Sequence, residues 1–461
     1  MAYDKDLMGA IAATRLGLGA KGGEIQDARS DPQSWLSAQI RPQGADLFRA
    51  DMPPAAERFA QYREFQLEKR QAKVAGVAAP DPVKQVRRLI RDDAGADLLA
   101  RLQLAATTDA SFRERWALFW ANHFTVSGAK VVTATLIGPF EQEAIRPRVF
   151  GRFEDMLVAS SSHPAMLLYL DQAQSIGPDS RAAMFMQRTG KHAGLNENLA
   201  REILELHTVG VEAGYSQADV TEFARAMTGW SIGGLKEAPD RAGKFVFRDN
   251  AHEPGPRTVM GKHYGDAGYE QARLVMRDLA SSPHTASHLA TKIARHFVAD
   301  DPPESLVSRL ARAYQDSQGD LAVVARSLIS APETWSPEAR KFKTPYEFIV
   351  SSWRAAGTSP TDVGRVAPVL TSMGQRPFAP PSPKGWPDET AAWADPDGIV
   401  KRMAWSETFS ATAGAGRDPV QLAQNALGER LTPLAAKTIA RAETRSEGLS
   451  ILLMSPEFQR R

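Results

Sequence analysis

The sequence predicts a mainly α-helical protein, a multi-helix assembly with one small inserted β-hairpin near residues 243–265. Three observations support this fold class. Apolar residues recur at helical spacing through most of the chain, residues typical of helix starts precede several of these runs, and only one segment alternates as a strand does.

The expected helices extend along most of the chain. "SFRERWALFWANHF" opens with Ser111 and Glu114 at capping-box spacing, and "SQADVTEFARAMTGW" does the same with Ser216 and Asp219. Apolar periodicity predicts further helices at about 55 to 75, 82 to 107, 153 to 170, 268 to 280, 284 to 299, 303 to 317, 319 to 330 and 338 to 356.

Two segments interrupt the helical pattern. "GKFVFRDNAHEPGPRTVMGKHYG", residues 243–265, has two short extended runs around a Pro/Gly-rich turn, which predicts a β-hairpin or paired strands. "GQRPFAPPSPKGWPDETAAWADP", residues 374–396, contains too many prolines for a helix. Its tryptophans, Trp386 and Trp393, favour a packed loop over a linker.

These segments suggest three regions. We expect an N-terminal helical region at 1–110, a motif-bearing helical core with the β-hairpin at 111–357, and a Pro-rich loop with a C-terminal helical region at 358–461. One continuous unit is the alternative, because length is a weak guide to domain number.

The composition excludes several classes of site. The 56 Lys+Arg and 54 Asp+Glu residues give a net charge of +2, which does not indicate nucleic acid or an anionic membrane as a partner. The absence of cysteine excludes disulfides, thiol nucleophiles and iron–sulfur clusters, and no haem-attachment motif is present. "GLGAKGG" lacks the strand and the Lys-Ser/Thr ending of a nucleotide-binding loop.

The sequence also bears on localisation. Its N-terminal stretch lacks the basic start, long apolar centre and cleavage site of a secretory signal. No run approaches the roughly 18 to 20 apolar residues that span a bilayer, so no transmembrane segment is expected. A cytoplasmic protein is the default expectation, unless a signal was trimmed or export occurs with a partner.

Several motifs together resemble the bacterial domain of unknown function 1800 family. In order, they are "WALFWANHFTVS", "MLLYLD", "NENLAREILELHTVGV", "YSQADVTEFARAMTGW", "HEPGPRTVMGKHY", "KIARHFVADDPP" and "GQRPFAPPSPKGW". The resemblance implies a mostly helical bacterial protein, with a sulfatase-like protein encoded nearby as a partner. Many relatives are exported, which makes the periplasm or cell surface the alternative compartment. Where relatives tend to read His-Asp, this chain reads His252 followed by Glu253.

The segment "NENLAREILELHTVG", residues 196–210, carries the candidate catalytic residues. A helical wheel places Leu199, Ile203 and Leu206 on a narrow apolar stripe that should enter the core. The opposite arc carries two acidic side chains, Glu202 and Glu205, which we interpret as a general acid and base. The remaining charged candidate is Arg201, which would anchor a polar or anionic substrate group.

A structural role explains the same arc. Glu197 and Arg201, and Arg201 and Glu205, have the i,i+4 spacing of ion pairs on a solvated helix face. The catalytic and the structural interpretations differ in one respect: the first requires the arc to face a pocket, and the second requires it to face water.

Histidines and polar residues from other motifs are candidates for the same site. His123, His207 and His252 are candidate ligands for a divalent metal, which a cysteine-free chain would hold with His, Asp and Glu. The alternative for His207 is a buried neutral side chain that holds a neighbouring loop. The candidate substrate-binding residues are Asn122, Asn196, Asn198, Trp230, Lys384 and Trp386.

Two functional hypotheses remain open. The first is a hydrolase or lyase that acts on a carbohydrate or another polar polymer with the clustered glutamates, with or without a metal. The second is a non-enzymatic assembly or partner-binding protein, in which the motif stabilises the helical core.

Overall fold

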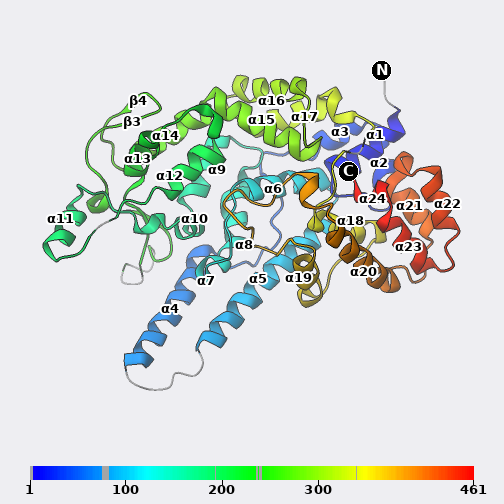
Figure 1. Ribbon diagram of the computed structural model, residues 1–461, viewed down its shortest axis with the longest axis horizontal. Helices are drawn as coiled ribbons and strands as arrows, with labels where there is room; N and C mark the ends of the chain where they lie inside the picture. Colours follow the sequence, from blue (N-terminus) through cyan, green and yellow to red (C-terminus); the bar gives the residue numbers. More distant parts are fainter. Residues whose placement is uncertain (1–3, 75–81, 193, 235–236, 238–240, 339) are drawn as a thin grey trace.

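The computed structural model describes residues 4–74, 82–192, 194–234, 237, 241–338 and 340–461. Within these residues the chain forms 24 α-helices and two antiparallel two-stranded sheets, which confirms the mainly α expectation (Figure 1). No helix in this part of the chain combines the length and the apolar character that crossing a bilayer requires.

The first half of the chain places long helices beside short ones. Figure 1 shows α4 and α5 projecting together from one side of the molecule. The elements up to the first sheet are α1 (Lys5–Ile11), α2 (Glu24–Arg29), α3 (Pro32–Ser37), α4 (Ala55–Val74), α5 (Pro82–Thr107), α6 (Ser111–His123), α7 (Val131–Ala134), α8 (Ile137–Phe140), α9 (Phe153–Ser162), α10 (Pro164–Tyr169), α11 (Arg181–Arg188), α12 (Asn198–Glu202) and α13 (Gln217–Met227).

The second half begins with the strands and ends with a group of helices at one end of the molecule (Figure 1). Its elements are β1 (Trp230–Ile232), β2 (Phe245–Phe247), β3 (Arg257–Val259), β4 (Lys262–Tyr264), α14 (Tyr269–Ser281), α15 (Pro283–Phe297), α16 (Glu304–Asp316), α17 (Leu321–Ser330), α18 (Pro345–Ala356), α19 (Val363–Ser372), α20 (Pro396–Ala413), α21 (Pro419–Leu427), α22 (Pro433–Ala440), α23 (Arg445–Met454) and α24 (Pro456–Gln459).

The two capping predictions have different outcomes. Ser216 and Asp219 form the expected capping box at the start of α13. The prediction for Ser111 and Glu114 is wrong, because α6 begins without a side-chain cap. Ser111 donates a hydrogen bond to Glu24 instead, at 2.8 Å, and Glu114 pairs with the buried Arg146 at 2.7 Å.

The strand region differs in its pairing from a single hairpin. β2 pairs with β1, the strand that precedes the inserted segment, so that Trp230 lies opposite Phe247. β3 and β4 form a hairpin of their own, joined by Met260 and Gly261. Both turn residues have positive φ, 48° and 76°, as the tight turns that suit strand twist require.

Buried apolar residues form two clusters. The larger is built around the aromatic residues of α6, including Trp116 and Trp120, and extends from Ile11 to Trp335. The smaller joins α5 and α18 to the C-terminal helices and includes Leu18 and Phe458. Residues from the first 110 positions enter both clusters. The division at 1–110, 111–357 and 358–461 stays a prediction.

Candidate functional site

The segment 196–210 is not a regular helix. α12 continues into a π-helical turn at Ile203–His207, whose wider spacing rotates the side chains that follow. Leu199 and Ile203 are buried as the helical wheel predicts, but Leu204 is also buried and Leu206 is only partly so. After Ile203, the π-helical turn therefore buries Leu204 and His207, where a regular helix would bury Leu206.

Arg201 connects α12 to α13. Its Nη2 lies 3.1 Å from Glu197 Oε2, the expected i,i+4 ion pair, and donates to Gln217 Oε1 at 2.9 Å. Glu197 also accepts hydrogen bonds from Gln217 and Thr221. Arg201 is 38% exposed, so a structural contact occupies it while part of its guanidinium remains at the surface.

The two candidate catalytic carboxyls lie beside two tyrosines. Burial, and then the neighbouring charge of Glu205, raise the pKa of Glu202. Tyr215 donates a hydrogen bond to Glu205 Oε2 at 3.2 Å. Burial and then the charge of Glu202 raise the pKa of Tyr169 to about 12. We call Tyr169, Glu202, Glu205 and Tyr215 the carboxylate–tyrosine cluster.

An open groove of about 590 Å³, which we call the polar groove, reaches the same segment at Asn198, but none of the four cluster residues lines it. Asn198, which lines the groove and is exposed, lies one helical turn before Glu202. Asn196 also lines it, but its side chain donates to Leu170 O at 3.0 Å and accepts from Asn198 N at 2.8 Å. The other lining residues include Asp171, Gln174, Met186 and His192.

Two of the three candidate metal-ligating histidines lie together. His123 and His207 are buried, with ring centroids 5.8 Å apart, and His123 Nε2 lies 3.2 Å from His207 O. Burial, and then the charge of Lys292, lower the pKa of His207 to about 3. Both ring nitrogens of His207 are buried without a hydrogen-bond partner among the described residues, so its side chain does not make the loop-holding hydrogen bond of the alternative interpretation.

The third histidine has different neighbours. His252 Nδ1 lies 2.9 Å from Thr228 O, and its ring packs edge-on against Phe247. Over the described ranges of the chain, no group of three or more His, Asp or Glu side chains is arranged to hold a metal ion.

The candidate substrate-binding residues outside the groove lie in several places. Trp230 is fully buried in the core, where its ring packs against Phe245 and Tyr269. Lys384 is exposed on the Pro-rich segment 374–396. Asn122 and Trp386 lie together, because the Asn122 side chain donates to Trp386 O at 2.9 Å and accepts from Trp386 N at 2.8 Å.

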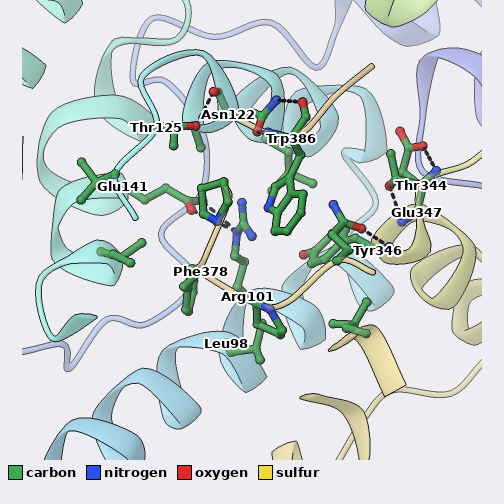
Figure 2. A pocket seen from close by; sticks show the side chains of 18 of the residues that line it. Leu98, Arg101, Asn122, Thr125, Glu141, Thr344, Tyr346, Glu347, Phe378 and Trp386 are labelled. Atoms are coloured by element: carbon green, nitrogen blue, oxygen red, sulfur yellow. Dashed lines mark hydrogen bonds and ion pairs between the residues drawn. The ribbon is translucent and has the colours of Figure 1, made fainter. Parts of the chain in front are cut away.

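The Pro-rich segment lines one part of a partly open cavity of about 140 Å³, which we call the loop cavity (Figure 2). Helices α5, α6, α15 and α18 supply most of the other walls. Among the lining residues are Arg101, Asn122, His296, Tyr346, Trp386 and Asp388. The lining residues of this cavity and of the polar groove do not overlap.

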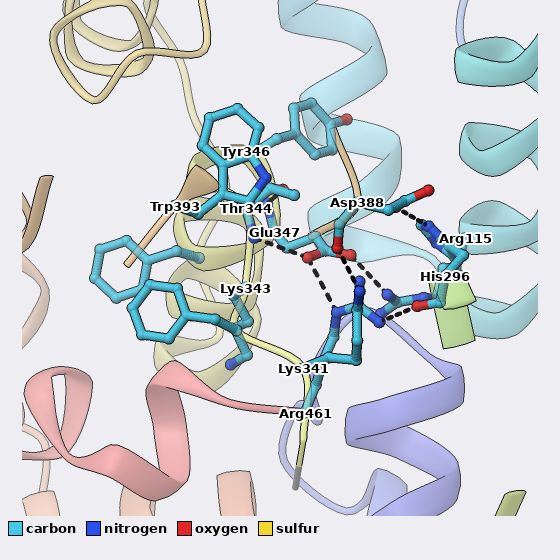
Figure 3. A network of polar contacts seen from close by, with 12 residues as sticks. Arg115, His296, Lys341, Lys343, Thr344, Tyr346, Glu347, Asp388, Trp393 and Arg461 are labelled. Carbon is cyan, nitrogen blue, oxygen red and sulfur yellow. Dashed lines mark hydrogen bonds and ion pairs between the residues drawn. The ribbon is translucent and has the colours of Figure 1, made fainter. Parts of the chain in front are cut away.

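A network of buried charges stands beside the loop cavity (Figure 3). Glu347 accepts from Arg115 at 2.6 Å and from Arg461 at 3.1 Å. His296 Nδ1 lies 2.7 Å from Asp388 Oδ1, and Lys341 donates to the backbone oxygen of Asp388. Through Asp388, this network fastens the Pro-rich segment to α15 at His296 and to the stretch before α18 at Lys341.

Sequence reasoning missed His296, Tyr346 and Asp388. His296 reads as a helix residue beside a core phenylalanine, and Asp388 as one acid in an irregular loop. The available signal was that "KIARHFVADDPP" and "GQRPFAPPSPKGW" both carry the family resemblance. Nothing in either motif indicates that the two segments meet.

Comparison with known proteins gives one match. A family model described as "Protein of unknown function (DUF1800)" matches residues 11–460, nearly the whole chain. No curated protein and no solved structure matches the chain.

Proposed function

The chain belongs to the DUF1800 family, described as proteins of unknown function, and we propose that this member is a hydrolase or lyase of a carbohydrate or another polar polymer. The observation that carries the proposal is the half-buried Glu202 beside Glu205. A carboxyl with a raised pKa next to a second carboxylate is a common arrangement for a general acid and a general base.

The surroundings of Glu202 and of Glu205 suggest a different catalytic role for each carboxyl. Glu202, whose pKa is raised by burial and by Glu205, keeps its proton to higher pH and acts as the general acid. Glu205, which accepts a hydrogen bond from Tyr215, acts as the general base. Arg201 supplies positive charge at the edge of the pair and opposes the rise of the Glu202 pKa.

The polar groove supports a polymeric substrate. It is an open groove rather than an enclosed cavity, so a chain could lie in it without being closed off from solvent. Its walls offer amide and carboxylate groups, including Gln174, Asn198 and Asp171, which can hydrogen-bond to substrate hydroxyls. Because Asn198 precedes Glu202 by one turn, a polymer lying in the groove would extend toward the carboxyl pair.

The test is a panel of neutral and acidic polysaccharides incubated with the purified protein. A hydrolase releases reducing ends alone, whereas a lyase acting on a uronic acid also produces an unsaturated sugar that absorbs ultraviolet light. We expect Glu202→Gln and Glu205→Gln each to lower kcat about 100-fold or more. Glu212→Gln, at an exposed position nearby, is the matched control. Full activity in both active-site variants would exclude the proposal.

A specific surface feature favours the second function, partner binding. On α11, Met184 is 48% exposed and Phe185 69% exposed, next to Met186, which lines the polar groove. Large apolar side chains exposed together on one helix are typical of contact surfaces. The sulfatase-like protein that the resemblance suggests is the partner to test by co-purification, with Phe185→Ser as the disrupting variant.

A further inference from the structure

We propose that the loop cavity is a second ligand site, which binds an uncharged single-ring molecule bearing a hydroxyl group, such as a phenol. This inference does not depend on the carboxylate–tyrosine cluster. It follows from two unpartnered polar atoms, from the balance of charge around the cavity, and from the cavity's size and apolar walls.

The first unpartnered atom belongs to His296. Its Nδ1 lies 2.7 Å from the Asp388 carboxylate, which can only accept, so Nδ1 carries the proton. The Nε2 atom is then the acceptor of a neutral ring, and it is buried without a hydrogen-bond partner in the described part of the chain. Burial lowers the pKa of His296 to about 4, which keeps this lone pair free at neutral pH.

The second unpartnered atom is the hydroxyl oxygen of Tyr346. It is buried and also lacks a hydrogen-bond partner among the described residues. The backbone nitrogen of Tyr346 is held by Gln375 Oε1 at 2.7 Å, which fixes the start of α18 against the Pro-rich segment. Leaving a buried polar group unpaired costs about 1–3 kcal/mol, so two such groups on one cavity indicate a missing partner.

The charges around the cavity are already balanced. Arg101 lies 3.0 Å from Glu141, and Arg115 lies 2.6 Å from Glu347. The Arg101 guanidinium also lies over the ring of Tyr346, 5.2 Å from its centroid. Since these cations have carboxylate partners, the cavity favours a neutral ligand over an ion.

The walls and the volume of the loop cavity limit the size and the polarity of the ligand. Apolar side chains, including Leu98, Leu118, Phe140 and Phe378, cover much of the surface, and the Trp386 indole lies among the lining side chains (Figure 2). Cavities of about 150 Å³ with apolar walls hold a single benzene-sized ring. A sugar ring of that size would leave most of its hydroxyls unpaired against these walls, whereas a phenol has one hydroxyl to satisfy.

Isothermal titration calorimetry with phenol and with toluene tests the proposal. We expect saturable phenol binding that is roughly three- to tenfold tighter than toluene binding, the range of one hydrogen bond. Tyr346→Phe should reduce that preference, because His296 Nε2 remains as an acceptor, while leaving the unfolding midpoint unchanged or higher, because the lost hydroxyl has no partner in the free protein. Tyr269→Phe, which removes a hydroxyl outside the cavity, should bind phenol as the wild type does.

Three outcomes would overturn the inference: no saturable binding of phenol, equal affinity for phenol and toluene, or an unchanged preference in Tyr346→Phe. A nitrogen-15 spectrum supplies a second readout, in which phenol should shift the Nε2 resonance of His296 and leave Nδ1 protonated. Glu202→Gln should retain phenol binding, so that failure here and failure of the proposed polymer chemistry are distinguishable.

Discussion

His296 Nδ1 and Asp388 Oδ1 lie 2.7 Å apart and join residues that are 92 positions apart in the sequence. Burial raises the pKa of Asp388, but its interactions with His296 and the nearby Lys341 outweigh that effect and lower the pKa to about 2. The contact therefore holds an ionised carboxylate in the interior and secures the Pro-rich segment over the loop cavity.

Removal of this carboxylate should loosen the segment. We expect Asp388→Ala to lower the free energy of unfolding by about 1.5–3 kcal/mol, the range for a hydrogen bond to a charged group. Urea denaturation measures the change. Glu389→Ala is the control, because it removes the neighbouring carboxylate while the contacts of His296 and Lys341 with Asp388 remain. Equal losses in the two variants would contradict a specific role for Asp388.

Stability should fall in mild acid because of four buried or half-buried histidines. Burial is the first cause that lowers the pKa of His207 to about 3, of His288 and His296 to about 4, and of His123 well below its usual value. Since the unfolded side chains titrate near 6.5, the unfolded chain binds more protons below about pH 6.5. The contribution of these neutral histidines to the free energy of unfolding is therefore complete above about pH 6.5. It is lost as the pH falls, with a slope of up to about 1.4 kcal/mol per pH unit for each histidine.

Urea denaturation between about pH 7 and about pH 5 measures this slope. His207→Leu removes one titrating side chain, so the slope of the unfolding free energy against pH should decrease by the contribution of that histidine. This expectation does not depend on how the substitution changes stability at neutral pH. His284→Gln, at an exposed position, should keep the wild-type slope. A wild-type slope in His207→Leu would show that His207 titrates normally in the folded protein.

A buried ion pair between Glu24 and Arg354 joins α2 to α18 and should contribute to the stability of the fold. Arg354 Nη2 lies 2.7 Å and 2.9 Å from the two carboxylate oxygens of Glu24. Arg354→Met leaves the Glu24 charge buried, and we expect a loss of about 3–5 kcal/mol in the free energy of unfolding. Arg365→Met, at an 89% exposed side chain, should change it little.

The double variant separates two explanations for that loss. Glu24→Met with Arg354→Met removes both charges, so part of the stability should return. If the double variant is as unstable as the sum of the two single variants, the pair contributes by packing rather than by compensation of charge.

Gly385 should be required for the contact between the Pro-rich segment and α6. Its φ is 86°, and a Cβ there would lie 2.6 Å from Asn122 O and 2.7 Å from Asn122 Oδ1. Gly374→Ala is a matched control, with φ of 89° and no atom within 4 Å of the added Cβ. We expect Gly374→Ala to cost about 1 kcal/mol of backbone strain, and Gly385→Ala to cost more because Asn122 must move. Equal losses in thermal denaturation would contradict the clash.

Local signals predicted local structure well. Ser216 and Asp219 form their capping box because both partners belong to one helical turn. The expected helix at 153–170 ends early, at Ser162, because Pro164 begins α10. Leu206 and Ser111 did not follow their patterns, since a π-helical turn shifts the first and Glu24 binds the second.

The sequence by itself determined the mainly helical class, most helix positions, the polar face that carries Glu202 and Glu205, and family membership. The first three follow from periodicities and spacings within a few residues, whereas family membership follows from the ordered motifs and the match over residues 11–460. Only the tertiary structure decided that Asp388 meets His296 and that Asn122 holds Trp386. Such contacts depend on how helices pack, and a hydrogen bond between distant segments leaves no period or spacing in either one.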